Sequence, residues 1–213
     1  MSDKLKLTLS ILIAAILWFL MFSPWTGGHL NFWLEMSCAA VILSSLVLAF
    51  TPDRKALFQV DKPLLQIAVG FAIALALWGV FWLGDKLSSM MFHFARHEVD
   101  AVYAMKTGLP PYAIALLLLL LIGPAEELFW RGYVQRTFAR ILPGKRSANL
   151  AFVLTTLIYA LVHIWSYNFM LVMAALVAGA VWGIIYRLNP KFLPALIVSH
   201  ALWDAMVFVI FPI

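Results

Sequence analysis

Two adjacent carboxylates and an arginine stand in an apolar stretch of this chain, in the run Gly123-Pro124-Ala125-Glu126-Glu127-Leu128-Phe129-Trp130-Arg131. Residues 113–122, just before it, are all Leu, Ile or Ala, which is typical of a helix in lipid. A carboxylate in hydrocarbon costs about 3 kcal/mol or more, so it needs a function or a partner. Four residues apart on a helix, Glu127 and Arg131 face each other, whereas Glu126 points about 100° away. The spacing predicts a Glu127–Arg131 ion pair and leaves Glu126 available for chemistry.

Further ionisable residues stand in apolar stretches nearer the C-terminus. His163 shares a helical face with Tyr159, four residues earlier, and His200 shares a face with Asp204 for the same reason. A Glu can take a proton from a water that a His positions, while other donors stabilise the oxyanion of a tetrahedral intermediate. These residue types therefore suit hydrolysis of an amide bond without a covalent intermediate.

The same residues also allow other interpretations. Two His and one carboxylate form a known catalytic zinc set, with Glu126, His163 and His200 as the ligands, although the chain has no HExxH motif. A polar network that only holds helices together is a third interpretation. Serine chemistry is disfavoured, because Ser199 is adjacent to His200 and points about 100° away from it.

The composition sets the class of protein that must position these groups. The 213 residues are 64% hydrophobic and only 12% charged, and the mean hydropathy is +0.96. We expect an all-α, polytopic transmembrane helical bundle that forms a single membrane domain over residues 1–213. The net charge of +5 comes from basic residues spread between the apolar spans, so it indicates membrane topology and no nucleic-acid partner.

Hydropathy and turn residues predict seven spans and one interfacial helix. The interfacial helix is expected within residues 85–106, where apolar residues fall near one face and the charged residues lie elsewhere; His93 and His97 fit its solvent-exposed side. The nine Trp lie mostly near span ends or in apolar faces, and a role at the membrane interface is expected to explain them. Residues 1–109 then hold the first three spans and the interfacial helix, and residues 110–212 hold the motifs. The seven predicted spans are 6–23, 30–50, 63–83, 110–138, 148–166, 169–187 and 192–212.

Counting along the predicted hairpins brings the polar residues to one depth. Glu126 and His163 lie 18 residues to either side of the turn at 144–145. Reflection through the next two turns arrives near residue 205, within about one helical turn of His200 and Asp204. Four ionisable side chains from three spans are thus expected to meet.

The distribution of basic residues predicts the orientation. Eleven of the fifteen fall on one side of the predicted bundle, which places the N-terminus in the cytoplasm, the C-terminus outside and the polar residues in the outer half of the bilayer. We expect a multi-pass protein of the cell membrane, in bacteria the inner membrane. The eleven are Lys4, Lys6, Arg54, Lys55, Lys62, Arg136, Arg140, Lys145, Arg146, Arg187 and Lys191.

Three motifs resemble those of the CPBP (Abi) family of intramembrane glutamic endopeptidases, which includes the eukaryotic CAAX prenyl-protein endopeptidase. They are Glu126-Glu127-x-x-x-Arg131 with Gly132, Tyr159-x-x-x-His163 and His200-x-x-x-Asp204, within about residues 110–210. The resemblance implies that Glu126 and His163 activate water and that His200 and Asp204 serve the oxyanion side. Two residues depart from the pattern. Tyr159 replaces the usual Phe, and Asp204 stands where the eukaryotic enzyme has Asn.

We therefore expect a membrane-embedded endopeptidase that acts near a hydrophobic or lipidated segment of a peptide or protein and needs no cofactor. Glu127, Arg131 and Tyr159 are expected to support the site. The alternatives are a zinc-dependent version of the peptidase, and a catalytically silent scaffold or bacteriocin-immunity protein of the same fold. A proton-coupled transporter fits less well, because the sequence has no internal repeat. The sequence predicts no particular oligomeric state.

Overall fold

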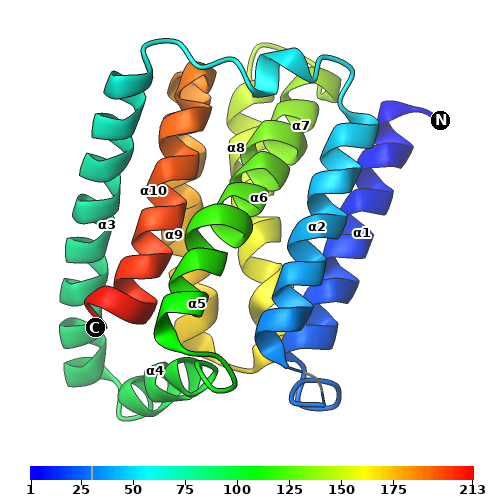
Figure 1. The fold of residues 1–213 in the computed structure, drawn as a ribbon. Helices are drawn as coiled ribbons and strands as arrows, with labels where there is room; N and C mark the ends of the chain where they lie inside the picture. Colours follow the sequence, from blue (N-terminus) through cyan, green and yellow to red (C-terminus); the bar gives the residue numbers. More distant parts are fainter. Residues whose placement is uncertain (30) are drawn as a thin grey trace.

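The computed structural model describes residues 1–29 and 31–213, and that part of the chain is built from helices without strands. Seven helical segments are long and apolar enough to cross a membrane, which confirms the expected class and number of spans. They lie side by side as a bundle (Figure 1). In chain order they are Asp3–Phe22 (α1), Phe32–Phe50 (α2), Pro63–Met91 (α3), Pro111–Ile141, Ser147–Ser166, Phe169–Leu188 (α9) and Pro190–Ile210.

The spans that carry the motifs are made of shorter pieces. Proline at position 124 has no backbone N–H to donate and its ring crowds the preceding turn, so an unbroken α-helix is disfavoured there. The helix widens to π geometry before and after the two glutamates, as π segments often do at functional sites. The pieces of the fourth span are α5 (Pro111–Leu117), the π segment Leu118–Ile122, α6 (Gly123–Glu127), the π segment Leu128–Gln135 and α7 (Arg136–Ile141). The fifth span is α8 (Ser147–Leu161) with the 3₁₀ turn Val162–Ser166, and the seventh is the 3₁₀ turn Pro190–Phe192, α10 (Leu193–Ala205) and the π segment Met206–Ile210.

The expected interfacial helix is shorter than predicted. Residues 85–91 continue α3, and the separate helix α4 covers only Ala95–Ala104, across one end of the bundle (Figure 1). The prediction over 85–106 was wrong in its first part because Asp85 does not interrupt the span. Its buried carboxylate lies 3.0 Å from the Arg96 guanidinium and 3.5 Å from the Lys86 ammonium, so its charge is neutralised.

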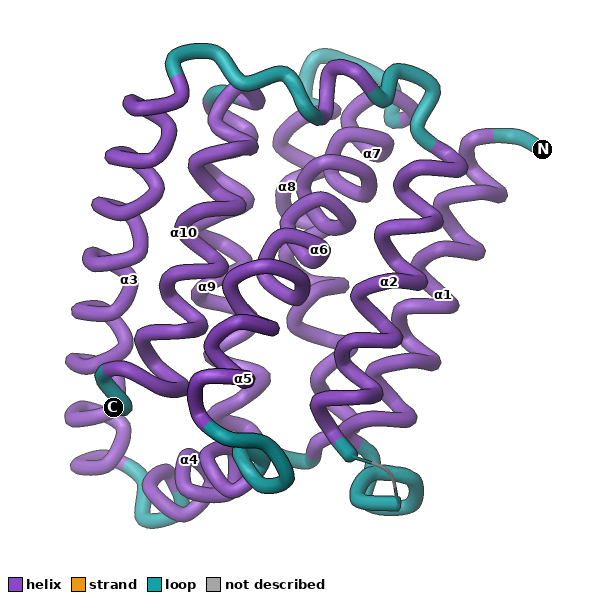
Figure 2. The backbone as a smooth tube through the Cα atoms, in the orientation of Figure 1, coloured by secondary structure: helices purple, strands orange, loops and turns teal. Residues whose placement is uncertain are grey.

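The connections gather at the two ends of the bundle (Figure 2). One end holds the start of α1 and the loops that carry Arg54, Lys62, Lys145 and Lys191, and we call it the basic end. The opposite end holds α4 and the connections at 23–29 and 167–168, and we call it the α4 end.

The bundle core is aromatic. Trp18, Trp33, Trp130 and Trp182 are each at most 1% exposed, so the expectation that the tryptophans serve the membrane interface is wrong for these four. A close helix contact aligns the motif-bearing spans, because a Cβ on Gly123 would lie 2.7 Å from the Cα of Ala201. Glycine therefore lets α6 lie directly against α10, and this contact sets how the two helices face each other.

Candidate active site

The predicted polar residues line one cavity of about 420 Å³. The polar residues come from three spans: from α6, from α8 with the Val162–Ser166 turn that follows it, and from α10. All five side chains are buried among apolar neighbours. The five are Glu126, Tyr159, His163, His200 and Asp204. The structure therefore brings together the residues that the hairpin count placed at one depth.

Glu126 accepts a hydrogen bond from the Tyr159 hydroxyl, with 3.1 Å between oxygens. Glu126 therefore has a side-chain partner, and the contact uses the hydroxyl by which Tyr159 departs from the family pattern. The phenol ring has room because position 179 is glycine. A Cβ there would lie 2.8 Å from Cδ1 of Tyr159.

Glu127 and Arg131 form the predicted ion pair, with 2.8 Å between Oε1 and Nη1. Both side chains are at most 1% exposed and do not border the cavity. The Arg131 Nη2 also donates to the Gly179 carbonyl at 3.1 Å. Glu127 does more than balance this charge, because its Oε1 also lies 2.9 Å from Nδ1 of His200. The ion pair thus supports the cavity wall from behind.

His200 is held at both ring nitrogens and on one face. Nδ1 meets Glu127, Nε2 lies 3.4 Å from Oδ2 of Asp204, and the ring stacks on Trp182 with 4.0 Å between ring centroids. The Trp182 indole N–H in turn donates to the Ser199 hydroxyl at 3.1 Å. Trp182 therefore belongs to the site, although no motif in the sequence indicated it. The sequence alone could not place Trp182 in the site, because its ring meets that of His200 only when α9 packs against α10.

His163 is also hydrogen-bonded at both ring nitrogens. Nδ1 lies 2.8 Å from the Tyr159 backbone carbonyl, and Nε2 lies 2.9 Å from the indole N–H of Trp18. The helix tightens to 3₁₀ geometry at Val162, and such a junction releases carbonyls from the α-helical ladder. Trp18 belongs to α1, outside all three motifs, and sequence reasoning missed it.

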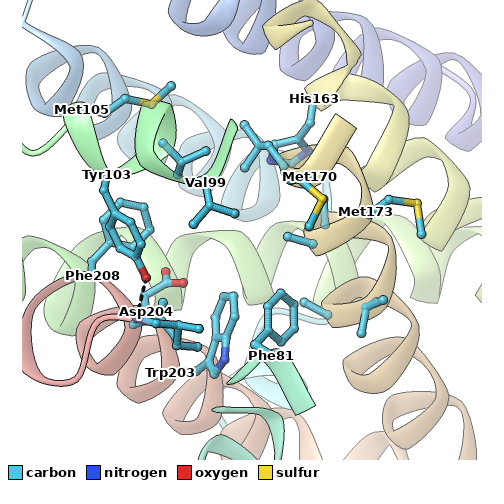
Figure 3. A pocket seen from close by; sticks show the side chains of 18 of the residues that line it. Phe81, Val99, Tyr103, Met105, His163, Met170, Met173, Trp203, Asp204 and Phe208 are labelled. Atoms are coloured by element: carbon cyan, nitrogen blue, oxygen red, sulfur yellow. Dashed lines mark hydrogen bonds between the residues drawn. The ribbon is translucent and has the colours of Figure 1, made fainter. Parts of the chain in front are cut away.

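The rest of the cavity wall is largely apolar. Figure 3 shows Phe81, Met105, Met170, Met173 and Phe208 around the open space, with Asp204 and His163 on its wall. Methionine side chains adapt to irregular apolar shapes. A space of this kind suits a hydrophobic group beside the polar residues.

The cavity lies toward the α4 end, since Val99, Val102 and Tyr103 of α4 border it. Burial raises the pKa of the Tyr103 phenol above its usual value, so this hydroxyl stays protonated. It accepts a hydrogen bond from the Ile213 backbone N–H at 2.9 Å. A second hollow, of about 370 Å³, lies at the basic end and contains none of the predicted site residues. The polar residues therefore face the end opposite the basic loops.

A metal centre is not evident in residues 1–29 and 31–213, where no group of three His, Cys, Asp or Glu side chains is arranged to hold an ion. Two of the three candidate zinc ligands, His163 and His200, use their ring nitrogens in the contacts described above. The third, Glu126, accepts from Tyr159. These residues would have to exchange partners to bind zinc.

Comparison with protein families agrees with the motifs. A family model described as "Type II CAAX prenyl endopeptidase Rce1-like" matches residues 108–206, which include all three motifs but not α1, α2 and α3. No curated protein and no solved structure matches the chain. The family indicates a protease, and the seven spans indicate a multi-pass membrane protein. Over residues 108–206 this chain is therefore similar to the Rce1-like type II CAAX prenyl endopeptidases, which is consistent with the resemblance to the CPBP family.

Proposed function

We propose that this protein is an intramembrane glutamic endopeptidase that hydrolyses a peptide bond near a hydrophobic or lipidated segment. The observation that carries the proposal is the environment of Glu126. This carboxylate borders the apolar cavity and makes no ion pair among the described residues, whereas its neighbour Glu127 is neutralised by Arg131. A buried carboxylate without a counter-charge lowers the stability of the fold, so its presence indicates a function. In this proposal that function is proton transfer.

In the proposed reaction Glu126 takes one proton from a water molecule while the water oxygen attacks the carbonyl carbon of the peptide. The C–O bond forms, the carbonyl π electrons move to oxygen, and a tetrahedral oxyanion results. The C–N bond then breaks, and the leaving nitrogen receives the proton held by Glu126. His163 positions the water through Nε2, since Nδ1 is bound to a carbonyl of its own helix.

The oxyanion is stabilised on the α10 side. Glu127 holds Nδ1 of His200 and the stacked Trp182 fixes the ring plane, so the N–H at Nε2, whose contact with Asp204 is long at 3.4 Å, is the donor offered to the oxyanion. A preorganised N–H donor of this kind is worth about 10²–10³-fold in rate. Asp204 orients His200 in this arrangement.

The test uses the purified full chain in lipid nanodiscs with two peptides of one sequence, one carrying a farnesylated cysteine and one unmodified. Mass spectrometry in H₂¹⁸O should find two product fragments and one ¹⁸O in the new carboxyl group. Glu126→Gln keeps the shape of the side chain but removes the base, so it should lose the products while its melting curve stays that of the wild type. Turnover in Glu126→Gln equal to wild type would refute the assigned base.

The same preparation separates the alternatives. Stoichiometric zinc in active protein, with activity lost to a chelator and restored by zinc, would favour the metallopeptidase. Absence of cleavage of either peptide by a folded wild-type chain would favour a silent scaffold or immunity protein of this fold.

We further propose that the basic end faces the cytoplasm and that the cavity opens toward the other side of the membrane. The basic residues gather at the end opposite α4, and α4 borders the cavity.

A further inference from the structure

The contact between Trp18 and His163 joins two parts of the chain that are 145 residues apart. Trp18 lies on α1 and is 1% exposed, and its indole N–H points at Nε2 of His163 across 2.9 Å. The two rings meet edge-on, at 79°. An indole N–H is a donor only, so Nε2 must be the acceptor.

With this contact, both ring nitrogens of His163 are engaged in hydrogen bonds. Nδ1 must be a donor because its partner, the Tyr159 carbonyl, only accepts. The ring is therefore the neutral tautomer with its proton on Nδ1 and a single in-plane lone pair on Nε2. Trp18 occupies that lone pair. A water can be held by Nε2 only after the indole N–H has left it.

The position of α1 makes such a release feasible. In the bundle α1 lies at an edge, packed mainly on α2, α7 and the Val162–Ser166 turn (Figure 1). The Glu127–Arg131–His200 contacts involve no residue of α1, so they do not depend directly on its position. Movement of this helix would therefore free Nε2 without disrupting the ion pair behind the cavity.

A neighbouring residue connects the contact to the cavity. Phe22 is four residues after Trp18, hence on the same face of α1, and it borders the cavity. Its ring lies 5.7 Å from the ring of His163 and 5.5 Å from that of Phe32. A hydrophobic group that enters the cavity meets Phe22 and pushes on the same helix face that carries Trp18.

We propose that Trp18 is a latch on the site: its indole N–H holds His163 in a resting arrangement, and a hydrophobic segment that displaces Phe22 releases Nε2 to bind the water. This inference rests on the proposed function, because it takes His163 as the residue that positions the water. It assigns a regulatory role to α1, which lies outside the residues matched by the family model.

The test removes the hydrogen bond and controls for the loss of ring volume that accompanies it. Trp18→Phe keeps an aromatic ring and loses the N–H. Trp130→Phe is the matched control, because Trp130 is also fully buried and in edge contact with Trp18, yet its indole N–H has no partner in the described part of the chain. Melting curves of both variants in nanodiscs establish that they fold.

The first readout does not depend on catalysis. Diethyl pyrocarbonate acylates a free imidazole lone pair, and mass spectrometry locates the product. Acylation of His163 should be about fivefold faster in Trp18→Phe than in wild type and Trp130→Phe, the factor expected for loss of one hydrogen bond. The exposed His29, His93 and His97 should react alike in all three proteins. An unchanged rate at His163 would overturn the latch.

The second readout needs no substitution. In the wild-type chain labelled with ¹⁵N-histidine, the Nε2 resonance of His163, assigned by its loss in His163→Gln, should shift away from its resting value when the farnesylated peptide is added, because the donor at Nε2 changes from the indole N–H to water. A resonance that stays at its resting value with the peptide bound would overturn the latch even if Trp18→Phe failed to fold.

The third readout is turnover. Trp18→Phe should raise kcat about fivefold, whereas a purely supporting role for Trp18 would lower it and overturn the latch. The outcomes separate the two proposals. Faster acylation with no peptide cleavage by any protein would support the hydrogen bond and refute the peptidase. Cleavage that needs Glu126 but ignores Trp18 in all readouts would retain the peptidase and refute the latch.

Discussion

Glu127 binds His200 through the same oxygen that binds Arg131: Oε1 lies 2.9 Å from Nδ1 of His200 and 2.8 Å from Nη1 of Arg131. The Glu127–Arg131 ion pair lies within one span, and through Glu127 it also fixes the position of His200 on another span. Stability and site geometry are coupled at this atom.

Loss of Arg131 should therefore destabilise the fold. Arg131→Ala removes the buried guanidinium partner of Glu127, and breaking a buried pair costs about 3–5 kcal/mol. We expect a clearly lower melting temperature in detergent. Arg140→Ala is the control, because its pair with Asp3 is partly exposed and is worth about 0–1 kcal/mol. Equal melting temperatures of Arg131→Ala and wild type would show that the ion pair does not stabilise the fold.

His163→Ala should abolish hydrolysis and leave a folded, extractable bundle. The side chain borders the cavity and, in the proposed reaction, positions the water. The loss should be about 10²–10⁴-fold in kcat, the usual contribution of acid–base assistance. Single-turnover assays with saturating peptide measure it, and a variant within twofold of wild type would show that His163 has no such role.

Tyr159→Phe should keep most of the activity. The ring and its packing remain, and only the O–H that donates to Glu126 is lost. Phe is also the residue that the family pattern has at this place. We expect kcat/KM within about tenfold of wild type, the factor for a typical net hydrogen bond of about 0.5–1.5 kcal/mol. A loss as complete as that of Glu126→Gln would instead make the tyrosine hydroxyl part of the reaction.

An added methyl group at position 179 on α9 should disturb the site through its contact with Tyr159. In Gly179→Ala the added Cβ would meet Cδ1 of Tyr159 at 2.8 Å and displace the ring that donates to Glu126. We expect both lower turnover and a lower melting temperature. Gly79→Ala on α3 has open space around its Cβ and should be neutral or slightly stabilising. Wild-type turnover in Gly179→Ala would show that the tyrosine ring need not stay in place.

Orientation is accessible to labelling of intact cells with a membrane-impermeant maleimide. The natural Cys38 is exposed on α2 and has to be replaced first. Tyr167→Cys, at the α4 end, should then label from outside and Gly144→Cys, at the basic end, should not. Met105→Cys on the cavity wall should label with Tyr167→Cys. If Gly144→Cys is labelled in intact cells, the orientation is the reverse of the one proposed. If Met105→Cys is labelled only after the cytoplasmic face is exposed, the cavity opens on the cytoplasmic side.

The sequence by itself determined the spans, their order and the local pairs. Hydropathy reflects the cost of burying polar groups in lipid, so seven apolar runs could be located to within a few residues, except where the paired Asp85 let α3 continue. Helical periodicity likewise placed Glu127 beside Arg131 and His200 beside Asp204, because partners four residues apart meet in any α-helix. Counting through the turns also gave the common depth of the polar residues.

Only the tertiary structure decided which residues touch across helices. The bond from Trp18 to His163 spans 145 residues, that from His200 to Glu127 spans 73, and that from Tyr159 to Glu126 spans 33. Depth in the membrane leaves each helix free to rotate about its axis, and rotation selects the partners. That rotation depends on side-chain packing, such as the close approaches at Gly123 and Gly179, which no single-residue scale contains.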